Sequence, residues 1–168
     1  MTDLRLRPLR PGDEESAVRW GADEEFCLAI DWDVGLPPEQ IRRHWQGIIT
    51  ASEPDFLRLG IESGKTLVGY TDLAQITSSD AEFGIAIGET GRWGRGLGQQ
   101  AGRLTLAHAF GELGLQTVTA EVHAPNGRSR ALMRRLGFVE VGRGRPEEYR
   151  GEVVPVIRFA LERAKFEG

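Results

Sequence analysis

The sequence of 168 residues lacks several features that would place it in other classes of protein. Cys27 is the only cysteine, so no disulfide can form within the chain, and with three scattered histidines there is no spacing for a zinc site. No apolar run approaches the roughly 20 residues that span a bilayer, and the N-terminal stretch has no apolar segment typical of a secretory signal. These absences predict a cytoplasmic protein that binds neither a metal nor a membrane.

The chain also has only a small net charge. The 21 basic and 25 acidic residues leave a formal net charge of -4, which gives no general attraction to a phosphate backbone. Nucleic acid is therefore not a predicted partner. With 40% hydrophobic residues, the chain has the length and the apolar content of one domain, and we expect that domain to cover residues 1–168.

Apolar periodicity and turn residues predict a mixed α+β domain in the order β-α-α-β-β-β-α-β-α-β-β. The expected strands are 4–9, 56–62, 66–77, 81–88, 117–123, 138–142 and 153–161. Asp13 is expected to cap the first helix, and Pro37-Pro38-Glu39 to open a second one that runs to about Ala51. Two further helices are expected at 97–113 and 129–136. Residues 23–33 mix acidic and aromatic side chains. Two interpretations of them stay open, the rim of a pocket for a cation and a solvated loop.

A glycine-rich turn at residues 92–101 joins a strand to a helix. Its glycines let the backbone approach a ligand, and the helix N-terminus adds partial positive charge, so the turn suits a pyrophosphate, with Arg95 as an additional contact. The spacing Gly96-x-Gly98-x-x-Ala101 also matches a dinucleotide fingerprint, but residues 88–95 intervene between the preceding strand and the first glycine. No Gly-Lys-Ser or Gly-Lys-Thr ends the turn, which excludes an ATP-binding loop of that kind.

Two motifs carry a family resemblance. The segment Trp93-Gly94-Arg95-Gly96-Leu97-Gly98 resembles the acetyl-CoA pyrophosphate loop of the Gcn5-related N-acetyltransferase (GNAT) superfamily, and Asn126-x-x-Ser129 followed by Leu136-Gly137-Phe138 resembles its second motif. Trp93 and the pair Glu148-Tyr149 look most like the branch of ribosomal-protein N-terminal acetyltransferases. The resemblance covers essentially the whole chain.

This resemblance implies a central, mostly antiparallel twisted sheet of about seven strands flanked by about four helices. A splayed pair of strands, 82–88 and 117–123, would hold the pantetheine arm of CoA. The implied cofactor contacts are Ile85, Ala86, Ile87, Trp93, Gly94, Arg95, Gly96, Leu97, Gly98, Gln99, Asn126 and Ser129. Acetyl-CoA would be the cosubstrate, and a homodimer is a further family expectation.

Acetyl transfer to an amine needs a proton acceptor and a group that protonates the departing thiolate. The resemblance implies Glu148 as the base, directly or through water, Ser129 at the leaving sulfur and Tyr149 as a second acid. Each has a plainer interpretation, since Glu148 could be an exposed acid in a loop and Ser129 a helix cap. Alternative bases are Glu82, Glu121 and His123, of which the histidine could equally be a loop hydrogen-bonder.

The predicted function is N-acetylation of a primary amine by direct attack on acetyl-CoA. The acceptor would be a small amine, with a preference for cations from the acidic segment 23–33, or a protein N-terminus. A noncatalytic acyl-CoA-binding or sensing module is the alternative. Pro155 and Phe159 motivate it, because relatives often carry an aspartate and a tyrosine in the last strand.

Overall fold

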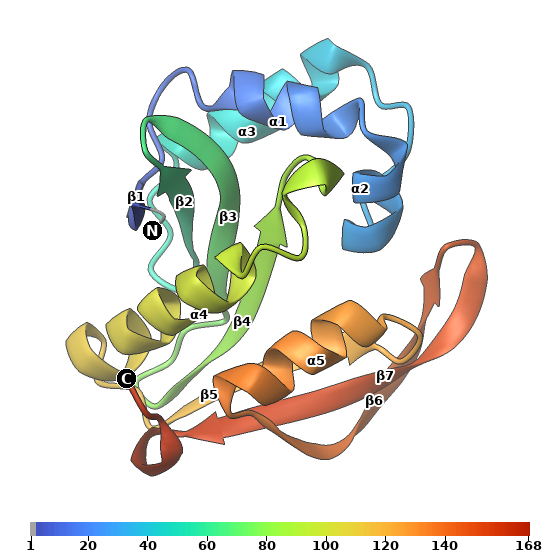
Figure 1. Ribbon diagram of the computed structural model, residues 1–168. Coiled ribbons are helices and arrows are strands. Elements are labelled where there is room, and N and C mark those ends of the chain that lie inside the picture. Colours follow the sequence, from blue (N-terminus) through green and yellow to red (C-terminus); the bar gives the residue numbers. More distant parts are fainter. Residues whose placement is uncertain (1–2) are drawn as a thin grey trace.

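Figure 1 shows the computed structural model of the chain, which describes residues 3–168. Met1 and Thr2, part of the N-terminal stretch and of the expected domain, lie outside the described residues. Seven strands of the described chain form one sheet in the order β1-β2-β3-β4-β5-β7-β6. They are β1 Leu4–Pro8, β2 Leu57–Ser63, β3 Thr66–Ala74, β4 Asp80–Ile87, β5 Thr117–His123, β6 Val139–Tyr149 and β7 Glu152–Glu162. Neighbouring strands are antiparallel except β4 and β5, which are parallel.

Helices cover both faces of this sheet. They are α1 Glu14–Gly21, α2 Glu24–Ile30, α3 Pro38–Thr50, α4 Leu97–Ala107 and α5 Gly127–Leu136. The helices α4 and α5 cross one face (Figure 1), where Leu106 and Met133 pack on Val118 and Phe159 in the largest apolar cluster. On the other face, α1 and α3 place Trp20 and other aromatic residues against β3 and β4 in a second cluster. No helix in the described part of the chain is long and apolar enough to cross a membrane.

The strands β4 and β5 pair only at one end. Their register covers Asp80 with Thr117, Ala81 with Val118 and Glu82 with Thr119, and it ends there. Both strands continue beyond this point, to Ile87 and His123, and they diverge (Figure 1). The expected α+β fold with a mostly antiparallel sheet of seven strands is therefore confirmed, with five helices in place of about four.

Three local predictions were wrong. Residues 24–30 form α2 rather than a loop, because the Asp23 carboxylate caps the helix by accepting from the Phe26 amide. Asp13 precedes α1 but does not cap it, since its carboxylate accepts from the Arg7 guanidinium and the Arg10 amide. The strand expected at 138–142 extends to Tyr149, so residues 145–149 are not a loop.

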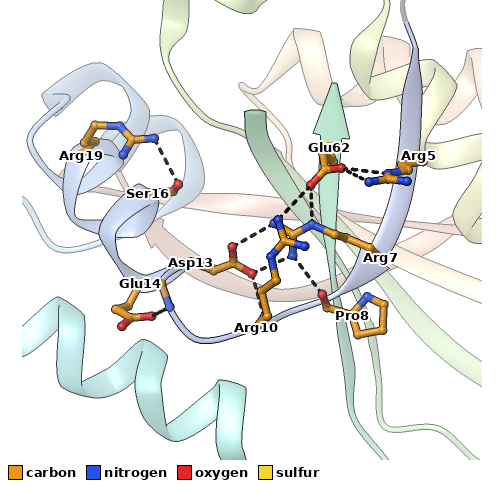
Figure 2. A network of polar contacts seen from close by, with 10 residues as sticks. Arg5, Arg7, Pro8, Arg10, Asp13, Glu14, Ser16, Arg19 and Glu62 are labelled. Carbon is orange, nitrogen blue, oxygen red and sulfur yellow. Dashed lines mark hydrogen bonds and ion pairs between the residues drawn. The ribbon is translucent and has the colours of Figure 1, made fainter. Parts of the chain in front are cut away.

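Asp13 belongs to a network of charges that ties β1 to β2 and to the start of α1 (Figure 2). The Arg7 guanidinium lies 2.9 Å from Asp13 Oδ2 and 2.6 Å from Glu62 Oε2, and Arg5 Nε lies 2.8 Å from Glu62 Oε1. Hydrogen bonds from Arg7 and Arg5 lower the pKa of Glu62. Burial alone would raise the pKa of Asp13, but the contacts with Arg7 and Arg10 outweigh burial and lower it. Arg7 is thus the shared partner of two carboxylates that burial has removed from water.

We expect Arg7→Met to lower the free energy of unfolding by roughly 2 kcal/mol at pH 7, because it leaves both carboxylates without their shared partner. Arg5→Met is the control, since the Arg5 side chain is 64% exposed, and it should lower stability by less than about 1 kcal/mol. Urea unfolding over a range of pH measures both. The lowered pKa values mean that this stabilisation is present above about pH 4 and is lost as the carboxylates protonate below it. An Arg7→Met deficit that persists unchanged at acid pH would contradict this account.

Candidate active site

A cavity of about 450 Å³ lies where β4 and β5 have separated, on the side of α4 and α5. Its walls come from the end of β4, the glycine-rich turn, the first turn of α4, one side of α5 along its length and the last turn of α2. Residues that line it are Ala29, Ile30, Ile85, Ile87, Arg92, Trp93, Gly94, Gly96, Leu97, Gly98, Gln99, Asn126, Arg128, Ser129, Ala131, Leu132 and Arg135.

The start of α4 presents backbone donors to this cavity. Gly94 and Gly96 both have φ of +78°, a left-handed conformation that glycine adopts without strain. The first intrahelical amide bond runs from Gln100 N to Gly96 O, so the amides before it have no partner within the helix. No acidic residue lies in the first turn of α4. These features make a site for an anion such as a pyrophosphate.

Trp93 joins the glycine-rich turn to the end of β4. Its indole Nε1 donates to Ile87 O at 2.8 Å, and the Arg128 guanidinium lies 4.0 Å from the centre of the indole ring. This arrangement holds the turn against the strand and brings a cation from α5 to the mouth of the cavity.

The peptide groups of β4 alternate between two directions. Thr71 Oγ1 and the Gly88 amide both donate across the β3–β4 pair, to Gly84 O and to Val68 O. The N–H and C=O groups of Ile85 and Ile87 therefore face the opposite edge, which β5 leaves free. A pantetheine arm could pair with these groups as an additional strand would.

Most of the predicted cofactor residues line the cavity, but two do not. Ala86 is buried in the aromatic cluster on the other face, and its peptide groups face β3. Arg95 is exposed outside the lining. Sequence reasoning predicted Ser129 of α5 but missed Arg92, the two residues of α2 and the other residues that α5 contributes. The positions 128, 131, 132 and 135 recur at helical spacing, and this spacing could have identified the α5 face.

Ser129 is the third residue of α5 and does not cap the helix. The cap is Asn126, whose Oδ1 accepts from Ser129 N at 3.2 Å. The Ser129 hydroxyl is therefore not needed as a helix cap. It lies at the cavity wall, next to Asn126, which caps α5.

On the opposite face of the sheet, the two splayed strands carry polar side chains. Val118, Ala120 and Val122 of β5 point into the core beneath α4 and α5, so Glu121 and His123 point the other way. Glu82 of β4 lies on that same face, as the partner of Thr119. His123 Nε2 lies 2.9 Å from Glu147 Oε2 of β6.

Two groups on this face have a displaced pKa. Burial is the main reason why the pKa of Glu82 is raised, and the charges of Glu121 and Glu147 raise it further, against an opposing effect of Arg158. Burial also raises the pKa of Tyr70 to about 12. Tyr70 thus stays protonated at neutral pH and cannot act as a base, whereas Glu82 is a carboxyl that binds a proton more readily than usual.

The structure separates the two neighbours Glu148 and Tyr149. The Tyr149 ring is buried and stacks on the His123 ring with centroids 4.5 Å apart. Glu148 is exposed, and alternation along β6 directs it away from the face that carries Glu147 and Tyr149. The β6–β7 turn is tied to α2, because the Arg150 guanidinium lies 2.6 Å from Glu25 Oε1.

Comparison with known proteins identifies the family. Residues 3–139 match the model of the acetyltransferase (GNAT) domain. The chain therefore belongs to the GNAT acetyltransferase family, whose cosubstrate is acetyl-CoA. An uncharacterized protein of Methanocaldococcus jannaschii is 33% identical over 86 residues, which are 51% of this chain and only 18% of that protein.

Solved structures share the fold over nearly the whole chain. The spermidine N-acetyltransferase of Vibrio cholerae, in complex with CoA and spermine, has a TM-score of 0.82 and 23% identity, with 96% of both chains covered. RimJ of Mycobacterium smegmatis, in complex with CoA-disulfide, has a TM-score of 0.82 and 24% identity over 95% of this chain and 81% of that one. At these identities the likeness is one of fold.

We expect Asn126→Ala to lower the free energy of unfolding by about 1 kcal/mol, because the Ser129 amide loses its cap. Asn126→Asp keeps an acceptor at the same place and should stay close to the wild type. Chemical denaturation of the three proteins, with and without CoA, measures the effect. Equal losses in both variants would show that the cap is not what holds the start of α5.

Proposed function

We propose that the chain catalyses acetyl-CoA-dependent N-acetylation of a small cationic amine of the polyamine type. The observation that carries this proposal is a group of carboxylates on the face of the sheet opposite the cofactor cavity, on and beside the two strands that separate there. Glu82, Glu121 and Glu147 lie on that face, with Arg158 as a nearby cation. A chain with several ammonium groups complements such a surface. The likeness in fold to a spermidine N-acetyltransferase supports the same choice.

The cofactor side supplies the contacts that acetyl-CoA requires. The amides at the start of α4 would hold its pyrophosphate, and the free peptide groups of Ile85 together with the Ile87 amide would pair with the pantetheine arm. An amide at this strand edge would also stabilise the charge that develops on the thioester oxygen. The Ser129 hydroxyl would donate a hydrogen bond to the departing sulfur, with Tyr149 as the alternative acid.

The acceptor amine attacks the acetyl carbon directly in this proposal, so no enzyme nucleophile is needed. Glu148 as the base, the expectation from the family resemblance, stays a prediction, and its exposed position away from Tyr149 does not support it. A protein N-terminus as acceptor would fit the likeness to RimJ and the ribosomal-protein branch. A cytoplasmic homodimer also stays a prediction.

Release of CoA thiol from acetyl-CoA, measured over a panel of polyamines, monoamines, amino acids and N-terminal peptides, tests the proposal. We expect turnover to be fastest with spermidine or spermine. The double variant Glu82→Gln/Glu121→Gln should raise the KM for spermidine roughly tenfold, because each lost charge contact is worth about 1 kcal/mol or less. The KM for acetyl-CoA should not change.

Glu112→Gln is the matched control, since Glu112 is exposed in the helical segment His108–Glu112 that follows α4, and its loss removes one negative charge outside the proposed acceptor face. Turnover with N-terminal peptides alone would replace the polyamine by a protein acceptor. Tight acetyl-CoA binding without thiol release over the whole panel would favour an acyl-CoA-sensing module.

A further inference from the structure

His123 ends β5 at a turn that leads from the carboxylate-bearing face of the sheet to the cofactor cavity. It is the last residue of β5, and its carbonyl accepts from the Asn126 amide at 2.9 Å. This tight turn sends the His123 side chain to the carboxylate-bearing face and places Asn126 and Ser129 at the wall of the cofactor cavity. One turn therefore connects the amine side with the end of the cavity that Ser129 marks.

Two residues of β6 fix the orientation of the imidazole ring. Glu147 Oε2 lies 2.9 Å from His123 Nε2, and the Tyr149 ring stacks on the imidazole at an interplanar angle of 17°. A carboxylate beside one ring nitrogen takes the N–H at that nitrogen and leaves the lone pair on the other. Among the hydrogen bonds of residues 3–168, none involves His123 Nδ1. The ring thus presents a free acceptor nitrogen and is held in one tautomer.

The surroundings of His123 contain several charged groups. Besides Glu147, the groups that face it are Glu121, two residues earlier on the same face of β5, and the phenol of Tyr149 from β6. Glu82 of β4 lies on the same face at the paired end of the two strands, opposite Thr119. Two cations are also near, since Arg158 of β7 is 4.0 Å from Glu121 and the Arg150 guanidinium is 5.6 Å from the centre of the Tyr149 ring. The carboxylates draw an ammonium group toward this face.

We propose that His123, positioned by Glu147 and Tyr149, is the proton acceptor for the amine substrate. The assignment rests on the proposed N-acetyltransferase function. The ammonium group of the acceptor gives one proton to His123 Nδ1 and becomes a neutral amine. The amine nitrogen forms a bond to the acetyl carbon, the bond from that carbon to sulfur breaks, and the nitrogen loses its second proton as the CoA thiolate gains one. The proton on His123 then passes to water, so that one proton is released in each turnover.

The proposal is tested by the pH dependence of kcat/KM with spermidine and acetyl-CoA in the full chain. His123→Gln should lower kcat/KM at pH 7 by about 100-fold or more, the usual size of general base catalysis. The decline of the rate toward acid pH that reflects protonation of the imidazole should disappear in this variant. Glu147→Gln, which loses the positioning contact and one acidic charge of this face, should lower kcat about tenfold, whereas Glu121→Gln, which loses only a charge, should raise the KM for spermidine and leave kcat nearly unchanged. Added imidazole should restore part of the activity of His123→Ala.

His108→Gln is the matched control, because it also removes a His–Glu contact, that of His108 Nδ1 with Glu112 Oε2 at 3.2 Å, in the helical segment that follows α4. It should keep wild-type kcat/KM. The dissociation constant for acetyl-CoA and the midpoint of thermal unfolding should stay unchanged in His123→Gln, which separates a lost base from a damaged fold.

Three results would overturn the assignment. Activity of His123→Gln within threefold of wild type at pH 7 would remove His123 from the proton transfer. If His123→Gln keeps its activity while Glu148→Gln or Glu82→Gln loses about 100-fold, that carboxylate is the proton acceptor instead of His123. A folded wild type that binds acetyl-CoA and acetylates no amine would overturn the proposed function along with this assignment.

Discussion

The end of pairing between β4 and β5 at Glu82 and Thr119 is the constraint on which the rest of the site depends. Beyond this point the edge of β4 has no strand partner, and unpaired backbone groups away from water are costly. The structure satisfies one of them internally, through the Trp93 indole at Ile87 O. The groups of Ile85 are left for a ligand with amides of its own. A cofactor that completes the sheet is thus the natural partner of this edge.

Strong contacts on each side compensate for the missing pairing. β4 stays bound to β3, and β5 pairs with β7 along its whole length. The end of β4 is held against α1 so closely that a Cβ at Gly88 would overlap the Trp20 indole. α2 bridges the gap from outside, because Asp23 accepts from the Thr90 amide and Glu25 pairs with Arg150. The two halves of the sheet, β1 to β4 and β5 to β7, are therefore apart at the site and are joined by the contacts around it.

Sequence reasoning succeeded where a segment is buried on one side. The strands of the meander alternate clearly, so their bounds were predicted within three residues. The helix expected at 97–113 begins at Leu97, but α4 ends at Ala107 and the segment His108–Glu112 continues as a π-helix. α2 was missed because it is only seven residues long and lies in an acidic stretch. The second half of β6 was missed because nearly all of it is exposed, so no alternation of apolar residues marks it. That error had a consequence for the site. In a loop Glu148 could face any direction, whereas in a strand it must point away from Glu147 and Tyr149.

Although the net charge of the chain is only -4, the two faces of the sheet near the gap carry charges of opposite sign. The cavity on the side of α4 and α5 has Arg92, Arg128 and Arg135 in its walls and no acidic residue among those that line it in the described chain. The other face carries Glu82, Glu121 and Glu147. A polyphosphate and a polycation that entered from the same side could not both meet a surface of opposite charge. For the proposed polycationic acceptor, an approach from the face opposite the cofactor gives each molecule a complementary surface.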